Sequence, residues 1–340
     1  MIKTIIYSCV FFNEKYLHLI NLLLKSYKLF GNSSDDVDYL IICNPNFQKK
    51  IQSIFDNLNI SGKIWCIDLK NKFEAGYSRL KIFDYPDINL YNKILYLDCD
   101  ILVTNSINNI LDFQLENQIY VLKECCHRFH HCQLFTDEEY NLLDKSSVFS
   151  SGILLFNNNI KIKDLFSQIL LHINNHITNN LPIPTCLDQP FIVYHAVKSN
   201  LYNNQKLINI VINNPKNFNN QTISHFPGGP GHYESKIVKM TNFMNNIMFN
   251  VTNIKVIKDN QDKNKQSLIN NKYTWENSNI EFLENYKMNA FGAGKYRFIN
   301  KYLIKCDFGG REHLLKFNDD YSRFISIRKD DFEVVVGNHL

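Results

Sequence analysis

The sequence of 340 residues is 45% hydrophobic and 21% charged, a globular composition long enough for one large core and a small second domain. Its net charge is only +4 and its basic residues are scattered, so nucleic acid is not expected as a partner. The nine cysteines are an odd number without a regular framework, which favours reduced thiols and a cytoplasmic protein.

The first segment, residues 5–12, is a short apolar run that resembles the hydrophobic part of a secretory leader. It lacks a small-residue cleavage site and runs directly into a helical pattern, so we expect a buried first strand instead. Apolar residues then recur at helical spacing from Leu17 to Tyr27, and Gly31 ends this helix. No segment is long and apolar enough to span a bilayer.

Strand and helix patterns alternate through the rest of the first 250 residues, which predicts a mostly parallel sheet with helices on both faces. The predicted strands are 39–43, 64–67, 94–97, 119–122, 153–156 and 208–212. The predicted helices are 47–58, 77–83, 162–177, 189–197 and 233–249.

The character of the sequence changes after residue 250. Residues 251–271 are polar and lack a core pattern, so we interpret them as a linker. In residues 272–340 apolar and polar residues alternate, as from Leu315 to Phe317, and Gly309 with Gly310 supplies a turn signal. This pattern predicts a small antiparallel β module.

The most informative segment is the apolar strand 94–97, which ends in Asp98 and Asp100. Acids in this place lie at the carboxyl edge of the sheet, where open α/β folds bind ligands. A spacing of two on extended backbone points both side chains the same way. Paired carboxylates suit Mg²⁺ or Mn²⁺, and such a cation can carry a diphosphate. The simpler alternative is a solvated turn at the end of a strand.

Further segments fall where a nucleotide-sugar site needs them. Tyr16 follows the first strand and could stack on a base, and Arg79 with Lys81 could neutralise phosphate. Taken singly, Tyr16 is as readily explained by helix packing and Arg79 by a surface charge. Their order along the chain is what favours a binding site.

Three more segments complete this pattern. The small residues 150–152 open a buried strand and leave room for a sugar ring, and Asp188 begins a helix, where it stays ionised and can orient hydroxyls. Residues 224–232 form a Gly/Pro-rich loop with two histidines, of which His225 could complete a metal site with the two acids. A helix cap and a structural hydrogen bond are the simpler alternatives for Asp188 and His225.

In this order the segments resemble those of the glycogenin-like enzymes, family 8 of the retaining glycosyltransferases with a GT-A fold. The resemblance covers about residues 1–250. Its residues are Asn13–Tyr16, Tyr77–Lys81, Leu97–Val103, Ser151–Gly152, Asp188–Gln189 and His225–Gly228.

The resemblance implies that Asp98, Asp100 and His225 bind Mn²⁺ or Mg²⁺, which holds the diphosphate of a UDP-sugar. It assigns catalytic roles to Arg79, Asp188 and Gln189. It places in the donor site Val10, Tyr16, Arg79, Lys81, Asp98, Cys99, Asp100, Ser150, Ser151, Gly152, His225, Gly228, Gly231 and His232.

The chain departs from the family pattern at two positions. Ser150 stands where the family usually has Asn, which alters sugar recognition. Gly231 stands where the family usually has a Lys that contacts the diphosphate. Backbone N–H groups of the turn 228–231, or His232, are the expected substitutes.

The expected activity is metal-dependent transfer of a hexose from a UDP-sugar to a glycan, glycoside or protein acceptor, with retention of configuration. Retention requires a carboxylate nucleophile, for which Asp188 is the obvious residue, or same-face attack guided by the departing phosphate; both routes stay open. The alternative is a carbohydrate-binding or assembly protein with a degenerate transferase domain and a lectin-like β module. A nucleotidyltransferase would need a Gly- and Arg-rich loop near the N-terminus, which is not seen. A homodimer is compatible with the sequence.

Two further features have competing explanations. Residues 125–132 contain three cysteines and three histidines, which invites a zinc site, but adjacent cysteines in so short a span favour a loop near the acceptor cleft. Trp65 and Trp275 could stack on sugars, but a Trp in a small β module is more often part of the core.

Overall fold

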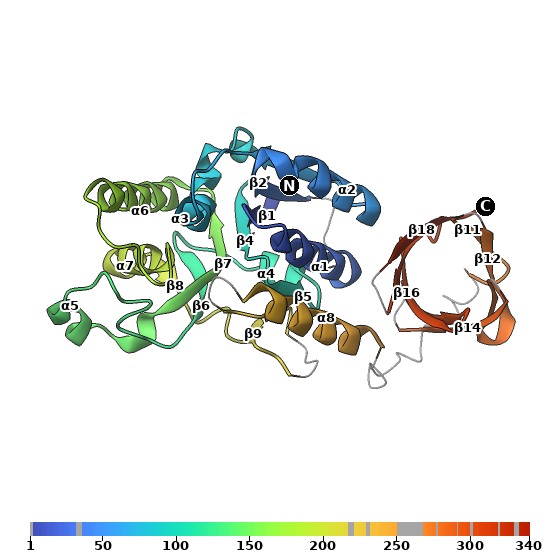
Figure 1. Cartoon of the computed structure of the whole chain (residues 1–340). Helices are drawn as coiled ribbons and strands as arrows, with labels where there is room; N and C mark the ends of the chain where they lie inside the picture. Colours follow the sequence, from blue (N-terminus) through green and yellow to red (C-terminus); the bar gives the residue numbers. More distant parts are fainter. Residues whose placement is uncertain are drawn as a thin grey trace. The chain divides into compact units, whose positions relative to one another are not determined.

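The computed structural model contains two compact units, residues 1–55 with 61–240 and residues 56–60 with 241–340 (Figure 1). The described residues are 3–31, 36–216, 221–228, 232–249, 268–276, 278–290, 292–299, 302–318, 320–329 and 333–340. Residues 251–267 of the expected linker lie outside the described residues, so the predicted domain boundaries stay a prediction.

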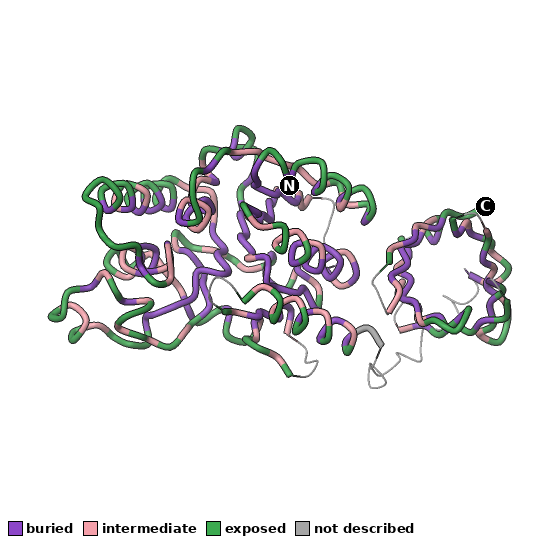
Figure 2. The backbone as a smooth tube through the Cα atoms, viewed as in Figure 1, coloured by how far each residue is buried: buried purple, intermediate pink, exposed green. Residues whose placement is uncertain are grey.

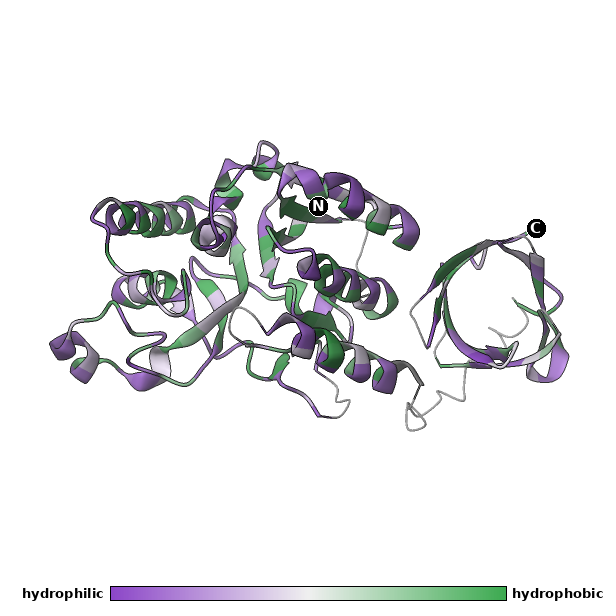
Figure 3. Ribbon diagram, in the orientation of Figure 1, coloured by the Kyte–Doolittle hydropathy of each residue, from purple (hydrophilic) through white to green (hydrophobic). Residues whose placement is uncertain are grey.

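The first unit is built on a seven-stranded sheet with the order β3-β2-β1-β4-β7-β6-β8. Its strands are β1 (Thr4–Val10), β2 (Val37–Cys43), β3 (Gly62–Cys66), β4 (Lys93–Leu97), β6 (Ile119–Lys123), β7 (Phe149–Asn157) and β8 (Tyr202–Asn203). The first four of these run parallel, and β7 runs antiparallel between β4 and β6. Apolar residues fill the central strands, which are buried along their length (Figures 2 and 3).

Helices cover both faces of this sheet, which confirms the predicted fold class. On one face α6 (Ile160–Thr178), α7 (Gln189–Ser199) and a 3₁₀ segment (Ser78–Asp84) pack against a core that includes Tyr7, Ile94 and Tyr96. On the other face α1 packs its Tyr27 ring 5.3 Å from that of Tyr39. The helices are α1 (Lys15–Phe30), α2 (Gln48–Leu58), α3 (Lys72–Tyr77), α4 (Asn108–Leu111), α5 (Asp137–Leu142), α6 (Ile160–Thr178), α7 (Gln189–Ser199) and α8 (Tyr233–Phe249). In the described part of the chain, no helix combines the length and the apolar character needed to cross a membrane.

The helix expected at 77–83 differs from the structure. Helix α3 ends at Tyr77, and Ser78–Asp84 form a 3₁₀ helix. Here the Ser78 hydroxyl donates to the carbonyl of Ala75 (2.7 Å) and the guanidinium of Arg79 to the carbonyl of Gly76 (3.1 Å). Side chains that bond nearby carbonyls compete with the regular helical ladder.

A three-stranded sheet, in the order β5-β10-β9, lies in the same unit. Its strands are β5 (Ile101–Val103), β9 (Val211–Asn213) and β10 (Ile223–His225). The expected strand 208–212 therefore lies slightly later, and His225 ends a strand instead of lying in a loop. The sequence pattern misses β10 because three residues are too few to show alternation.

The second unit is an eight-stranded antiparallel sheet with its strands in chain order, which confirms the predicted β module. A bridge between Tyr273 and His339 joins its last strand to its first, so the sheet closes on itself. Trp275 is buried inside, 5.0 Å from the ring of Phe308, and is part of the core. The strands are β11 (Lys272–Trp275), β12 (Ser278–Phe282), β13 (Lys287–Asn289), β14 (Ala293–Phe298), β15 (Leu303–Phe308), β16 (Arg311–Phe317), β17 (Arg323–Arg328) and β18 (Val334–Asn338).

Candidate metal and donor site

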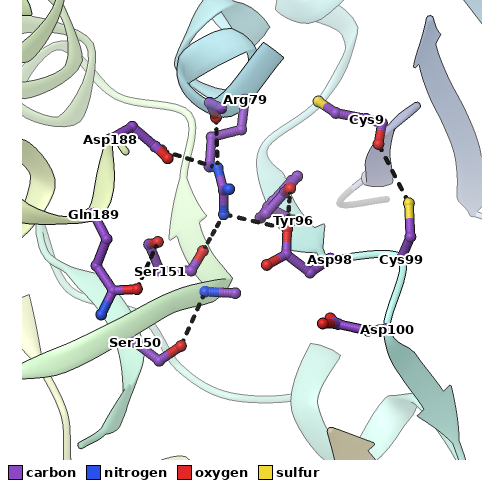
Figure 4. Close-up of polar contacts among 12 residues, drawn as sticks. Cys9, Arg79, Tyr96, Asp98, Cys99, Asp100, Ser150, Ser151, Asp188 and Gln189 are labelled. Atoms are coloured by element: carbon purple, nitrogen blue, oxygen red, sulfur yellow. Dashed lines mark hydrogen bonds and ion pairs between the residues drawn. The ribbon is translucent and has the colours of Figure 1, made fainter. Parts of the chain in front are cut away.

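Asp98 and Asp100 lie at the carboxyl edge of the large sheet, as the sequence predicts. Asp98 directly follows β4, and Asp100 directly precedes β5. Because β7 runs antiparallel to β4, the start of β7 lies at the same edge, and the N–H of Asp98 donates to the carbonyl of Gly152 (2.9 Å). This pairing places the expected small-residue segment beside the acids (Figure 4).

The short strands β5 and β10 bring His225 to Asp100. His225 pairs with Ile101 in their antiparallel register, and the N–H of Phe226 donates to the carbonyl of Asp100 (2.9 Å). His225 Nε2 then lies 3.6 Å from Asp100 Oδ1. Ligand atoms of Asp98, Asp100 and His225 all lie within 4.8 Å of one another. The structure thus brings together the three predicted metal ligands, of which His225 lies far from the two acids in the sequence.

Asn213 orients the His225 ring. Its Oδ1 lies 2.8 Å from His225 Nδ1, and an amide oxygen can only accept, so Nδ1 donates. With Nδ1 bonded in this way, Nε2 faces the two acids, which is the usual arrangement of a metal-ligating histidine. No sequence pattern indicates Asn213, because its role depends on the pairing of β9 with β10.

The space between the three ligands fits a cation. Asp100 Oδ1 is buried and accepts no hydrogen bond. A Cβ on Gly152 would lie 3.1 Å from both Asp98 Oδ2 and His225 Nε2, so any side chain here would crowd these two ligand atoms. Burial opposes ionisation of Asp100, but its interactions with His225 and with the ammonium of Lys236 outweigh it and lower the pKa of this carboxyl to about 2. Asp100 therefore carries its charge at neutral pH.

Arg79 is buried between two carboxylates (Figure 4). Its Nη1 lies 3.3 Å from Asp98 Oδ1, and its Nε lies 3.1 Å from Asp188 Oδ2. Nη1 also donates to the carbonyl of Ser151 (2.7 Å), and the guanidinium stacks on the ring of Tyr96. Burial opposes the charge of Arg79, but Asp188 and Asp98 outweigh it and raise the pKa of the guanidinium. Arg79 therefore stays charged and links Asp98, a predicted metal ligand, to Asp188.

Asp188 stands at the start of α7 but does not cap it, since its side chain accepts no N–H group there. The carboxyl is buried, and Oδ2 has no hydrogen-bond partner besides the ion pair with Arg79. Burial raises the pKa of Asp188 to about 6, and the charge of Arg79 limits the rise. With this pKa the carboxyl is ionised at neutral pH, and the charge that compensates it is that of Arg79, where the sequence pattern indicates the helix N-terminus.

Gln189 and the serines of β7 form the far side of the site. Ser151 Oγ donates to Gln189 Oε1 (3.5 Å), and Ser150 Oγ accepts from the N–H of Gly152 (3.2 Å). Gln189 Nε2 in turn donates to Glu124 Oε2 (3.1 Å). Glu124 is a polar neighbour that the sequence did not indicate.

Tyr16 lies at the start of α1, where its ring meets that of Tyr233 edge-on at 5.0 Å.

Three further residues predicted for the donor site form no hydrogen bond or ion pair with the side chains of Asp98 and Asp100 among the described residues. Cys99 is buried and donates to the carbonyl of Cys9, and Val10 is fully buried at the end of β1. The Lys81 ammonium lies over the ring of Tyr77, and it forms no ion pair with an acid in the described part of the chain.

The Gly/Pro-rich loop is only partly described. Gly228 packs against the side chain of Lys236, and His232 is exposed just before α8. Gly231 lies outside the described residues. Lys236 itself was missed by the sequence reasoning, and its Nζ lies 2.6 Å from Asp100 Oδ2.

Residues 125–132 do not assemble a metal site in the structure. Cys126 Sγ and Cys132 Sγ lie 3.2 Å apart, and the rings of His127, His130 and His131 lie about 6 Å from one another. Within the described part of the chain, Asp98, Asp100 and His225 are the one cluster with metal-ligand spacing.

The chain was compared with known protein families, protein sequences and solved structures. The family described as "Glycosyl transferase family 8" matches residues 10–229, which include every residue of the cluster. No curated protein sequence is significantly similar to the chain.

Two solved structures are similar in fold. The apo structure of the bifunctional glycosyltransferase WbbM is 15% identical, with a TM-score of 0.49 over 71% of this chain and 50% of that one. The glycosyltransferase GlyE of Streptococcus pneumoniae TIGR4 is 14% identical, with a TM-score of 0.44 over 79% of this chain and 73% of that one. The chain thus spans half the length of WbbM.

Proposed function

The chain belongs to glycosyl transferase family 8, and from this premise we propose that it transfers a hexose from a UDP-sugar to a glycan, glycoside or protein acceptor. The proposal rests on the cluster of Asp98, Asp100 and His225, whose buried Asp100 Oδ1 lacks a hydrogen bond. Two carboxylates and an imidazole suit Mn²⁺ well, and Mg²⁺ is the alternative.

Cleavage of a sugar from UDP leaves negative charge on the β-phosphate. A metal held by Asp98, Asp100 and His225 would offset this charge. Arg79 adds a second positive group that is already oriented, because Asp98, Asp188 and the carbonyl of Ser151 hold its guanidinium. A positive group that is oriented before the reaction stabilises the developing negative charge without having to reorient.

We further propose that Asp188 positions Arg79 and does not attack the sugar. The side chain of Asp188 is only 2% exposed, and its Oδ2 faces Arg79 Nε. A nucleophile must reach the anomeric carbon, whereas this oxygen is occupied by an ion pair. Retention would then follow from same-face attack guided by the departing phosphate.

The carbohydrate-binding alternative receives no support from Trp275, which is buried in the second unit. Trp65 is only partly buried, but it packs against Tyr85 with ring centroids 5.7 Å apart. We therefore keep the transferase as the single proposed function.

The test is release of UDP from a panel of UDP-sugars, measured with Mn²⁺ and with a chelator. Asp100→Asn should lower the rate by about 100-fold or more, since it removes one metal ligand. Asp84→Asn, an exposed acid on the 3₁₀ helix, is the matched control and should keep the wild-type rate. Full turnover by a folded Asp100→Asn variant, or turnover in the chelator, would show that the metal assignment is wrong.

A further inference from the structure

Lys236 is the one ammonium that touches the acidic cluster among the described residues. It lies on the first turns of α8, and its Nζ donates to Asp100 Oδ2 at 2.6 Å. The side chain is only 13% exposed. Its Cε lies 3.2 Å from the position of a Cβ on Gly228, so it runs along the backbone of the loop after β10.

The start of α8 is fixed against the start of α1, which places this ammonium. Tyr233 meets Tyr16 edge-on, and Glu234 Oε1 pairs with Lys15 Nζ at 2.6 Å. The N–H of Lys236 donates to the carbonyl of His232 (3.1 Å). Lys236 thus emerges from an anchored helical turn, beside the loop that carries His225.

The charges around Asp100 suggest what this ammonium does. Lys236 occupies Oδ2 of Asp100, while Oδ1 faces His225 and the space between the metal ligands. A divalent cation in that space and the ammonium of Lys236 are like charges that share one carboxylate. They repel each other when no other anion is present. A diphosphate carries enough negative charge to bind both at once.

Lys236 also stands in the part of the site where the sequence is unusual. Gly231 lacks the lysine that the family resemblance places at that position. Lys236 follows five residues later, and its side chain returns to Gly228 and the metal ligands. The basic group that is missing from the loop is thus available from the helix.

We propose that Lys236 binds the diphosphate of the nucleotide donor together with the metal, in place of a lysine at position 231. This inference rests on the proposed UDP-sugar donor. It predicts two effects of opposite sign when the ammonium is removed. Metal binding alone should become tighter, because a repelling charge is lost, and binding of the metal–diphosphate complex should become weaker.

The test is titration calorimetry with three probes: Mn²⁺ alone, UDP in saturating Mn²⁺, and uridine in saturating Mn²⁺. For Lys236→Met we expect Mn²⁺ alone to bind about 5-fold more tightly. We expect UDP to bind about 10-fold more weakly, the usual effect of losing a hydrogen bond to a charged group. Uridine, which has no phosphate, should bind as it does to the wild type.

Lys239→Met is the matched control, because Lys239 is exposed on the same helix and the substitution removes the same charge. It should leave all three affinities unchanged. Lys236→Arg should restore most of the UDP affinity, since it keeps the positive charge. Thermal melting checks that each variant folds, and Lys236→Gln replaces the Met variant if that one does not.

The outcomes separate the two proposals. If the wild type binds UDP equally well with and without Mn²⁺, the proposed function itself is wrong. If the wild type needs Mn²⁺ and Lys236→Met binds UDP with unchanged affinity, only the role of Lys236 is overturned. Equal weakening of UDP and uridine would also overturn it, because the loss would then not involve the phosphates.

Discussion

Three carboxylates carry the site: Asp100 and Asp188 are buried and Asp98 is partly exposed, and the charged groups around them differ. Asp98 faces Arg79 and accepts a hydrogen bond from the hydroxyl of Tyr96. Asp100 faces His225 and Lys236. Among the described residues, Asp188 forms an ion pair with Arg79 alone. This difference explains why the pKa of Asp100 falls to about 2 while that of Asp188 rises to about 6.

The raised pKa of Asp188 predicts a pH dependence of stability. The ordinary pKa of the carboxyl is 3.8 and the folded value is about 6. Below the ordinary value both folded and unfolded chains bind this proton. Between pH 3.8 and 6 the unfolded chain has already lost this proton, whereas the folded chain still binds it, so rising pH favours the unfolded chain. Stability relative to an Asp188→Asn variant should therefore fall between these values, by up to about 3 kcal/mol.

This prediction is checked by urea unfolding at several pH values between about 4 and 7.5. The chain has two tryptophans, so Trp65 fluorescence in a Trp275→Phe background reports on the first unit alone. The informative quantity is the free energy of unfolding of the wild type minus that of Asp188→Asn, followed as the pH changes. A difference that stays constant or grows with pH would contradict the raised pKa.

At this scale the sequence predicted the residues that carry chemistry but not the residues that hold them. Asp98, Asp100, His225 and Arg79 each had a recognisable place in the chain order. Lys236 had none, because its role depends on where α8 docks. Contacts made across 136 residues of separation leave no local pattern.

At the scale of elements, two strand pairings build the site. The antiparallel pair β4–β7 places Gly152 beside Asp98, and the pair β5–β10 places His225 beside Asp100. The long apolar runs of the parallel strands could be predicted from the sequence. Strands of three residues could not, which is why His225 was expected in a loop.

The strand β9 supplies the partner of His225, and this yields a prediction for Asn213. Asn213→Ala removes the hydrogen bond to His225 Nδ1 and frees the ring to rotate. Mn²⁺ affinity should fall by about 10- to 100-fold, the usual effect of losing the partner of a metal-ligating histidine. Calorimetry gives the affinity, and a melting temperature close to that of the wild type should accompany it. Unchanged affinity would mean that Asn213 does not orient the ring.

At the scale of the whole molecule, the chain combines a helix-covered, mostly parallel sheet with a closed antiparallel sheet. Both could be predicted, because period-two alternation and the strand–helix order are strong signals. The closure of the second sheet could not, since it depends on the pairing of residues near 273 and 339. All the residues of the proposed donor site that the structure describes belong to the first unit.

The central claim is that Asp98, Asp100 and His225 hold a metal that the nucleotide needs. The most direct measurement is calorimetric titration of UDP into the full chain, with Mn²⁺ and then with a chelator. We expect binding with Mn²⁺, at least about 10-fold weaker binding in the chelator, and the same weakening for Asp98→Asn in Mn²⁺. UDP binding that is indifferent to both the chelator and Asp98→Asn would contradict the claim.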